Sequence, residues 1–134
     1  MISLIDPYII ELPSIGSSNI GFITVAEWKK EVSFEIKRVY WTYYTPHHIE
    51  RGGHAHKTLQ QILIAANGIV DITVKDKKEK SKIYILDSPN KGLFLPPPFW
   101  HTMRFSHNAV LLCLASDLFQ EEDYIRDYDT FKNS

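Results

Sequence analysis

The sequence predicts an all-β domain, an antiparallel sandwich or barrel, that ends in a short helix. Runs rich in β-branched and aromatic residues follow one another along the chain, and clusters of Gly, Pro, Asn and Asp separate them. Near the C-terminus the apolar residues change to helical spacing. Short strands with turn signals every 8–12 residues or so are typical of antiparallel sandwiches and barrels.

Several of the predicted strands alternate apolar and polar residues, which predicts one buried face. In Ile69–Lys75, for example, Val70, Ile72 and Val74 point the same way. Asn67–Gly68 just before it is a hairpin-type dipeptide. The predicted strands are Ile20–Val25, Phe34–Tyr44, Gln61–Ala66, Ile69–Lys75, Ser81–Leu86, Gly92–Leu95, His101–Phe105 and Val110–Leu114.

The segment Glu121–Phe131 differs from the rest of the chain. It opens with acidic residues, which favour a helix N-terminus, and Tyr124 and Tyr128 recur at helical spacing. We predict a short C-terminal helix that packs against the β-domain and projects Arg126.

Composition limits the classes of function. The chain has 134 residues, 44% of them apolar, which suits a single domain over residues 1–134 with a buried core. The net charge of −1 gives no footprint for nucleic acid or an anionic membrane surface. No apolar run approaches about 20 residues and no signal-peptide pattern is present, so we expect a cytoplasmic protein. Cys113 is the only cysteine, which excludes an internal disulfide, and its leucine neighbours predict a buried, inert thiol.

Six histidines stand against that one cysteine. His54 and His56 are two positions apart, so in a strand their side chains share one face and Ala55 points away. We interpret this pair as functional rather than as two surface histidines. His101 follows a rigid run of prolines; it either joins the pair or lies buried beside Trp100 with a backbone hydrogen bond. The other three, in turn-rich segments, are expected at the surface: His47, His48 and His107.

The spacing of these histidines resembles the two motifs of the cupin superfamily, which are small jelly-roll β-barrels. In the first motif, His54 and His56 are followed by four residues, Gln61, six residues and Gly68. The second motif corresponds to Pro96–His101 and ends in His101. Gln61 stands where the cupin motif has Glu. A metal cupin uses three imidazoles and a carboxylate, so a neutral amide weakens attraction for a cation and favours acid–base chemistry without a metal or other cofactor. A three-histidine zinc or copper site stays open.

A closer resemblance covers about Ile20 to Phe131. The sequence is similar to the dTDP-sugar 3,4-ketoisomerases, also called WxcM-like sugar isomerases, in five segments: Phe34–Tyr40, Arg51–Lys57, Trp100–His101, Leu114–Asp117 and Asp123–Asp129. The resemblance implies a metal-free cupin homodimer with N-terminal strands exchanged between subunits. It implies conversion of dTDP-4-keto-6-deoxyglucose to a 3-keto isomer, for 3-amino-3,6-dideoxy sugars of bacterial surface glycans such as lipopolysaccharide. An aminotransferase, often with an acyltransferase, acts downstream in that scheme.

The residues suit this chemistry. Moving a ketone from C4 to C3 removes a proton from C3, passes through an enediol and delivers a proton to C4, which groups of near-neutral pKa do best. We assign this exchange to His54 and His56, with Tyr40 at the sugar oxygens. Which histidine takes the C3 proton stays open.

Arginine side chains suit the substrate's diphosphate. Arg51 and Arg126 are the principal candidates. Arg38 is a third, with a structural role as the alternative. His101 and Arg104 are assigned to the substrate site as well.

One departure from the family pattern concerns the product. Ser18–Gly21 replaces the family's Asp-x-Arg-Gly or Asp-x-Tyr-Gly element, and Ile20 occupies an often polar position. The configuration at C4, galacto or gluco, therefore stays open.

Three other functions compete with the ketoisomerase. A cupin-type nucleotide-sugar epimerase is favoured by a His–Asp pair with a Tyr acid. A non-catalytic sugar-binding cupin would carry a DNA-binding segment, and no helix-turn-helix pattern is present. A metal-dependent oxygenase requires bound iron.

Overall fold

Twelve short strands build the fold of residues 5–134, the part of the chain that the computed structural model describes. They are β1 (Tyr8–Glu11), β2 (Ser14–Ser17), β3 (Gly21–Thr24), β4 (Arg38–Thr42), β5 (Glu50–His56), β6 (Gln61–Asn67), β7 (Val70–Lys75), β8 (Ser81–Leu86), β9 (Lys91–Leu95), β10 (Trp100–Phe105), β11 (Val110–Ala115) and β12 (Tyr124–Ile125). A 3₁₀ turn, η1 (Glu121–Asp123), and a helix, α1 (Tyr128–Lys132), complete them.

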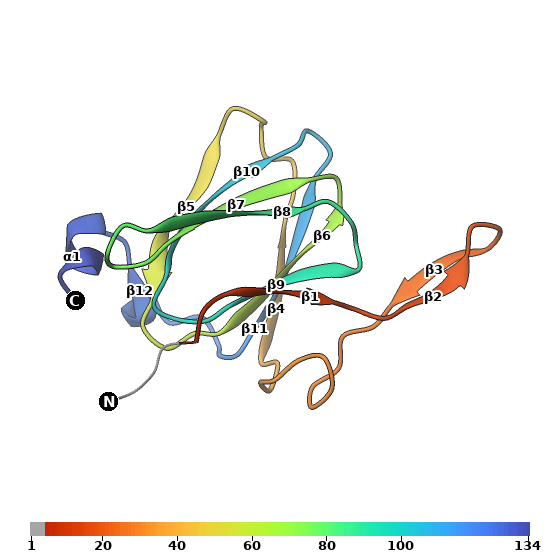
Figure 1. Cartoon of the computed structure of the whole chain (residues 1–134), viewed down its shortest axis with the longest axis horizontal. Helices are drawn as coiled ribbons and strands as arrows, with labels where there is room; N and C mark the ends of the chain where they lie inside the picture. The colour runs from red at the N-terminus through yellow and green to blue at the C-terminus, as the bar shows by residue number, and fades with distance from the viewer. Residues whose placement is uncertain (1–4) are drawn as a thin grey trace.

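The strands form two antiparallel five-stranded sheets that face one another around a barrel (Figure 1). The first sheet has the order β1-β9-β6-β11-β4 and the second the order β12-β5-β10-β7-β8. Apart from the consecutive strands β7 and β8, neighbours in the two sheets come from distant parts of the sequence, as in a jelly roll. This confirms the predicted all-β fold.

Apolar side chains fill the space between the sheets. Leu63 of β6, Ile72 of β7, Leu93 of β9 and Leu111 of β11 belong to this core and are almost fully buried. Cys113 lies in the same core, as its leucine neighbours predicted. Fully burying one such side chain contributes about 1.5–3 kcal/mol.

A second cluster covers the outer face of the first sheet. Val32 and Phe34, from the segment before β4, pack there on Ile62 and Phe94. This corrects the predicted strand Phe34–Tyr44, because Phe34 serves the outer cluster and pairing begins only at Arg38.

The Asn67–Gly68 turn does not close a hairpin, contrary to the prediction. β6 pairs with β9 and β11, whereas β7 pairs with β8 and β10, so the turn leads from one sheet to the other. Gly68 has φ of 71°, and a Cβ there would approach Ala109 Cα to 2.7 Å. Glycine is required by both conditions.

The predicted short C-terminal helix is present as α1, but it covers only the end of the predicted segment Glu121–Phe131. Tyr124 and Ile125 pair with His56 and Ala55 as strand β12, so strand pairing at the edge of β5 overrides their helical spacing. The helix begins only at Tyr128, after the Asp127 carboxylate accepts a hydrogen bond from the Thr130 amide. No helix within residues 5–134 is long and apolar enough to cross a membrane.

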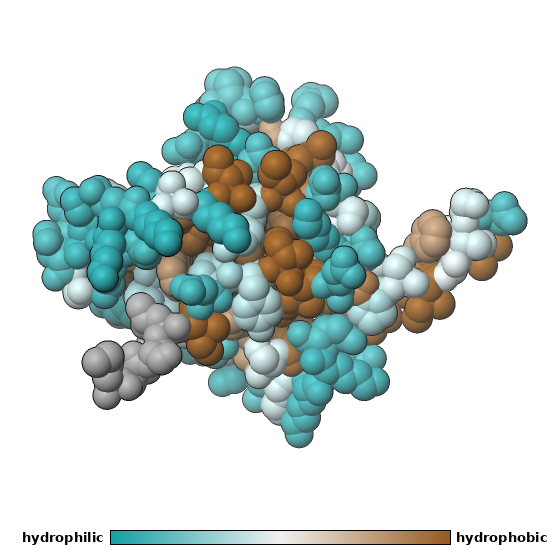
Figure 2. Space-filling model, in the orientation of Figure 1, coloured by the Kyte–Doolittle hydropathy of each residue, from teal (hydrophilic) through white to brown (hydrophobic). Residues whose placement is uncertain are grey.

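Strands β2 and β3 form a hairpin that projects from the barrel (Figure 1). Apolar atoms cover much of this arm in Figure 2. Ile15, Ile20, Phe22 and Ile23 are each 60–85% exposed. These side chains therefore do not form a buried core within the arm.

Phe131 fastens the C-terminal segment to β5, because it is fully buried against Ala55 and Ile125. We predict that Phe131→Ala lowers the free energy of unfolding by about 3–5 kcal/mol, measured by urea denaturation at fixed protein concentration. Lys132→Ala is the control and has a much smaller effect, since its ion pair with Glu79 lies largely in water. Equal effects of the two variants would contradict this packing.

Candidate active site

Six strands line a cavity of about 340 Å³ between the sheets: β4, β5, β6, β10, β11 and β12. Six of the eight residues predicted for the site line it: Arg38, Tyr40, Arg51, His54, His101 and Arg126. Residues far apart in the sequence therefore meet as the site prediction requires.

His54 and His101 are cross-strand neighbours on β5 and β10, with ring centroids 4.6 Å apart. The register of these strands shifts directly after this pair. Gly52 lies at the shift with φ of 87°, and a Cβ there would lie 2.8 Å from the His101 carbonyl oxygen. Gly52 thus allows β5 and β10 to approach closely.

His56 lies next to His54, with ring centroids 5.0 Å apart, and Ala55 points to the opposite face as predicted. His56 is only 3% exposed and does not line the cavity. Its Nδ1 lies 3.0 Å from Asp123 Oδ2. The carboxylate accepts a hydrogen bond from the Nδ1–H group, so the neutral ring carries its proton on Nδ1 and none on Nε2.

Asp123 is itself firmly held, because it also accepts hydrogen bonds from the amide and hydroxyl of Thr58, both at 2.8 Å. Burial raises the pKa of Asp123, but the hydrogen bonds from Thr58 and His56 outweigh this and lower it overall. The carboxylate is therefore charged at neutral pH and fixes the orientation of His56.

The three imidazoles are neutral at physiological pH. Burial, reinforced by the neighbouring His56, lowers the pKa of His54 to about 4. Burial also lowers the pKa of His56, against the opposing effect of Asp123. It lowers that of His101 well below the usual range. Neutral imidazoles can accept protons, as a base must.

Tyr40 of β4 brings a hydroxyl into this cavity. Burial raises the pKa of Tyr40 well above its usual value, so the phenol keeps its proton. Its oxygen accepts a hydrogen bond of 2.9 Å from Gln61 Nε2. Cys113 lies beside both, and burial raises its thiol pKa to about 12, which keeps it unreactive.

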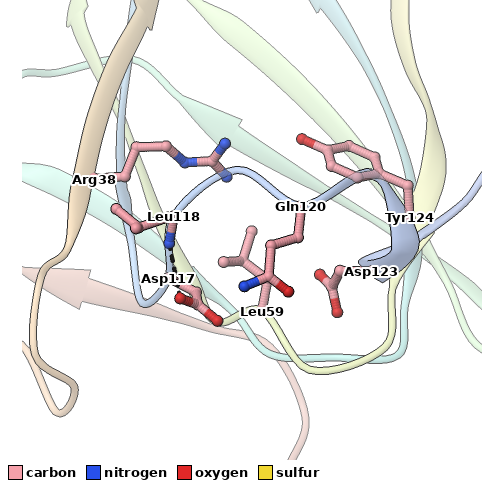
Figure 3. Close-up of a pocket in the computed structure, with 7 residues that line it drawn as sticks. All are labelled: Arg38, Leu59, Asp117, Leu118, Gln120, Asp123 and Tyr124. Atoms are coloured by element: carbon pink, nitrogen blue, oxygen red, sulfur yellow. Dashed lines mark hydrogen bonds between the residues drawn. The ribbon is translucent and has the colours of Figure 1, made fainter.

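Arg38 is half-buried on β4, while the neighbouring Lys37 is exposed. Its guanidinium lies 5.2 Å from the Tyr40 ring and 5.6 Å from that of Phe119. Figure 3 shows Arg38 and Tyr124 pointing toward one another across a small pocket next to the cavity. Arg38 Nε is buried and has no hydrogen-bond partner among the described residues.

The other two arginines of the cavity are more exposed. Arg126 follows β12, stacks 4.3 Å from the Tyr124 ring and donates two hydrogen bonds to Glu121, of 2.6 and 2.9 Å. Arg51 comes from β5. Both can reach a ligand that enters from solvent.

Arg104 is the predicted site residue that the structure places elsewhere. It does not line the cavity but reaches Glu50 at 3.6 Å and the His48 carbonyl. The alternation of β10 explains this: His101 and Phe105 are buried, whereas Arg104 is exposed on the outer face.

The donor set does not fit the metal site of a metal cupin. Within residues 5–134, no three His, Cys, Asp or Glu side chains are arranged to hold a metal ion. Gln61 provides no carboxylate, and its amide nitrogen is directed at Tyr40. The proton-transfer chemistry is therefore assigned to protein side chains alone.

Sequence reasoning missed two residues of the site. Asp123 and Tyr124 belong to the motif Asp123–Asp129, of which only Arg126 was assigned a role. Tyr124 lies 4.9 Å from His54 and 4.5 Å from His56, between ring centroids. Asp123 comes immediately before Tyr124 and three positions before Arg126. This acidic residue was the available signal for a hydrogen-bond partner of His56.

Comparison with known proteins places this architecture. The family described as FdtA: WxcM-like, C-terminal matches residues 5–134. The protein belongs to this WxcM-like family. This confirms the resemblance drawn from the sequence motifs.

Relatives of the WxcM-like protein are named as isomerases. The TDP-4-oxo-6-deoxy-α-D-glucose-3,4-oxoisomerase of Aneurinibacillus thermoaerophilus is 43% identical over 113 residues, which cover 84% of this chain and 81% of that protein. A 3,4-ketoisomerase from Helicobacter canadensis is 41% identical, with a TM-score of 0.90 over 97% of each chain.

A third relative has been solved with ligands. QdtA, a sugar 3,4-ketoisomerase from Thermoanaerobacterium thermosaccharolyticum in complex with TDP, is 39% identical with a TM-score of 0.92, over 98% of this chain and 95% of that one. A variant of QdtA is known in complex with TDP-4-keto-6-deoxyglucose. The cupin-like fold of the WxcM-like protein is thus the fold of sugar 3,4-ketoisomerases.

The buried histidines make stability depend on pH. The pKa of His54 is about 4 in the folded chain and about 6.5 when unfolded, so between these values the unfolded chain binds more protons. The free energy of unfolding is therefore highest above pH 6.5 and falls as the pH drops toward 4. We predict this fall in urea denaturation at pH 7.5, 6 and 5.

Two matched variants test whether His54 causes this pH dependence of the free energy of unfolding. His54→Gln makes the pH dependence shallower, whereas His107→Gln, at an exposed turn, leaves it unchanged. A wild-type pH dependence in His54→Gln would show that His54 is not buried in its neutral form.

Proposed function

We propose that this chain is a dTDP-sugar 3,4-ketoisomerase. It converts dTDP-4-keto-6-deoxy-D-glucose to a dTDP-3-keto-6-deoxyhexose without a metal or other cofactor. One observation carries this: a neutral imidazole, His54, and an un-ionised phenol, Tyr40, line one cavity together with three arginines. The named functions of the relatives support the same reaction.

Proton transfer at carbon is assigned to the His54–His56 pair. His54 lines the cavity and takes the C3 proton as its neutral ring becomes imidazolium. The electron pair of the broken C3–H bond forms the C3–C4 double bond of the enediol, and the C4 oxygen gains a proton from the Tyr40 phenol. The His54 imidazolium then returns a proton to C4, and the C3 oxygen gives its proton back to Tyr40, which completes the 3-keto product.

His56 supports this transfer from behind. The Asp123 carboxylate holds its Nδ1 proton and stabilises positive charge that develops on the pair. His56 Nε2 is buried without a partner among the described residues, so it is free to accept a proton from the neighbouring His54 ring.

The other cavity residues bind the substrate. Tyr40 donates to the sugar oxygens at C3 and C4, where negative charge develops in the enediol. Arg51, Arg126 and Arg38 bind the diphosphate, for which the guanidinium fork is suited. His101 lies against His54 and borders the sugar. Arg104, on the outer face of β10, has no part in this site.

A His–Asp pair beside a tyrosine is also the feature that favours a cupin-type epimerase, and the His56–Asp123 pair with Tyr124 provides it. This feature therefore does not separate the two enzymes. Membership of the WxcM-like family, with relatives named as 3,4-ketoisomerases, favours the ketoisomerase. The proton-transfer groups in the cavity favour an enzyme over a silent sugar-binding cupin.

The proposal includes a homodimer that exchanges its N-terminal strands. The projecting β2–β3 arm supports this, because apolar side chains that are 60–85% exposed lose contact with water when a second copy covers them. Residues 1–134 then form one domain in each subunit. A cytoplasmic location, a downstream aminotransferase and a role in surface-glycan synthesis belong to the same proposal as predictions.

The reaction is tested by incubating the protein with dTDP-4-keto-6-deoxyglucose in D₂O and following the sugar by NMR. We predict a 3-keto product that carries solvent deuterium at C4, because the C3 proton exchanges on the enzyme. The configuration at C4 identifies a galacto or gluco product. A 3,5-epimerised 4-keto sugar would establish the alternative, and unchanged substrate would contradict the proposal.

His54→Asn and His56→Asn test the proton-transfer pair. We predict that each lowers kcat by about 100-fold or more and lowers deuterium incorporation at C4 in parallel. His107→Asn, which changes an exposed histidine, keeps the wild-type rate. Normal turnover in either of the first two variants would remove that residue from the mechanism.

Phe22→Lys tests the arm. We predict that this charge, on the exposed face of the arm, converts the dimer to a monomer in light scattering after size-exclusion chromatography. Ile69→Lys, at an exposed turn outside the arm, leaves the dimer intact. A monomeric wild-type protein would contradict strand exchange, as would a dimer unaffected by Phe22→Lys.

A further inference from the structure

Gln61 occupies the position at which a metal cupin has its carboxylate, and it remains unexplained by proton transfer or diphosphate binding. It is 1% exposed at the start of β6 and lines the cavity. Burying a polar amide this deeply is costly unless its atoms have partners. Its contacts therefore indicate why an amide is present.

The amide nitrogen has two acceptors. It donates to Tyr40 Oη at 2.9 Å and to Cys113 Sγ at 3.5 Å. The thiol in turn contacts its own strand, donating to the Leu114 carbonyl at 3.8 Å. Gln61 is thus the donor that connects the strand of Tyr40 with the core of the first sheet.

This direction of donation matters for Tyr40. A phenol has one proton, and when its oxygen accepts a bond from an amide N–H, that proton is free for another acceptor. An ionised carboxylate at position 61 accepts only, so it would take the phenolic proton for itself. The amide therefore leaves the Tyr40 proton available to the cavity, where burial keeps it on the oxygen.

The amide oxygen gives a second, independent observation. Gln61 Oε1 is buried and has no hydrogen-bond partner within the described part of the chain. An unsatisfied buried acceptor is unfavourable, and a donor on a bound ligand satisfies it. The substrate has such a donor, because a sugar hydroxyl is present at the reacting carbons.

We propose that Gln61 is a positioning residue for the ketoisomerase reaction. Its Nε2 orients the Tyr40 hydroxyl so that the phenolic proton points at the sugar oxygens, and its Oε1 accepts a hydrogen bond from a sugar hydroxyl. This inference rests on the proposed function and assigns a role to the residue that replaces the cupin carboxylate.

The test is a double-mutant cycle on kcat and KM with dTDP-4-keto-6-deoxyglucose, using Gln61→Leu, Tyr40→Phe and the double variant. We predict that Gln61→Leu lowers kcat about 10- to 100-fold and changes KM less than about threefold, because the arginines still hold the diphosphate. On kcat the double variant is no slower than Tyr40→Phe alone, because Gln61 acts on the chemical step through Tyr40. The lost bond from Oε1 to the sugar hydroxyl appears in the small change of KM. The inference is overturned if the losses of kcat in the two single variants multiply in the double variant. It is also overturned if Gln61→Leu changes KM alone.

Gln61→Glu keeps the test decisive if Gln61→Leu does not fold, because it retains the volume of the side chain. Its assays contain a chelator, since a carboxylate beside three imidazoles completes a metal-binding donor set. At pH 7.5 we predict a similar fall in kcat, because the carboxylate turns the Tyr40 proton away from the substrate. Wild-type kcat in Gln61→Glu would overturn the proposal.

Different results contradict the proposed ketoisomerase function and the proposed role of Gln61. A wild-type protein that produces no 3-keto sugar contradicts the ketoisomerase function. An active wild type with equally active Gln61 variants contradicts only the role of Gln61. His107→Gln is the control, because it changes an exposed histidine that does not line the cavity, and its kcat stays within about twofold of wild type.

Discussion

The burial of three neutral imidazoles at the junction of β5 and β10 is the constraint on which the site depends. His54, His56 and His101 lie with ring centroids 4.6–6.2 Å apart, so a charge on one opposes a charge on the others. The fold accommodates them in two ways. Gly52 of β5 allows the strands to approach, and Asp123 fixes His56 in one tautomer.

The same constraint separates the chemistry from the binding of charge. Neutral groups line the cavity beside these histidines, namely the His54 and His101 imidazoles, the Tyr40 phenol and the Gln61 amide. The exposed arginines, Arg51 and Arg126, lie where a ligand enters from solvent. A chain with a net charge of −1 can therefore bind an anionic nucleotide sugar through a few guanidinium groups without being basic overall.

Much of the site could be predicted because its signals are local. The spacing of His54 and His56 places them on one strand face, and the proline run before His101 marks the start of β10. The parts that could not be predicted depend on tertiary pairing. Tyr124 and Ile125 have helical spacing but become a strand because the edge of β5 was free, and this pairing brings Asp123 to His56.

The face of Arg104 was available from the sequence, because Arg104 is three positions from His101 and alternation along a strand places the two on opposite faces. The projecting arm is a further part that could not be predicted, because its apolar residues serve no core within the described chain.

The central claim, that burial keeps this histidine cluster neutral, is tested most directly by ¹⁵N NMR of the imidazole side chains between pH 4 and 8. The account predicts that His54 stays neutral down to a pKa of about 4 and that His56 carries its proton on Nδ1. A His54 ring that is already protonated at pH 6.5, or a His56 ring protonated only on Nε2, would contradict it.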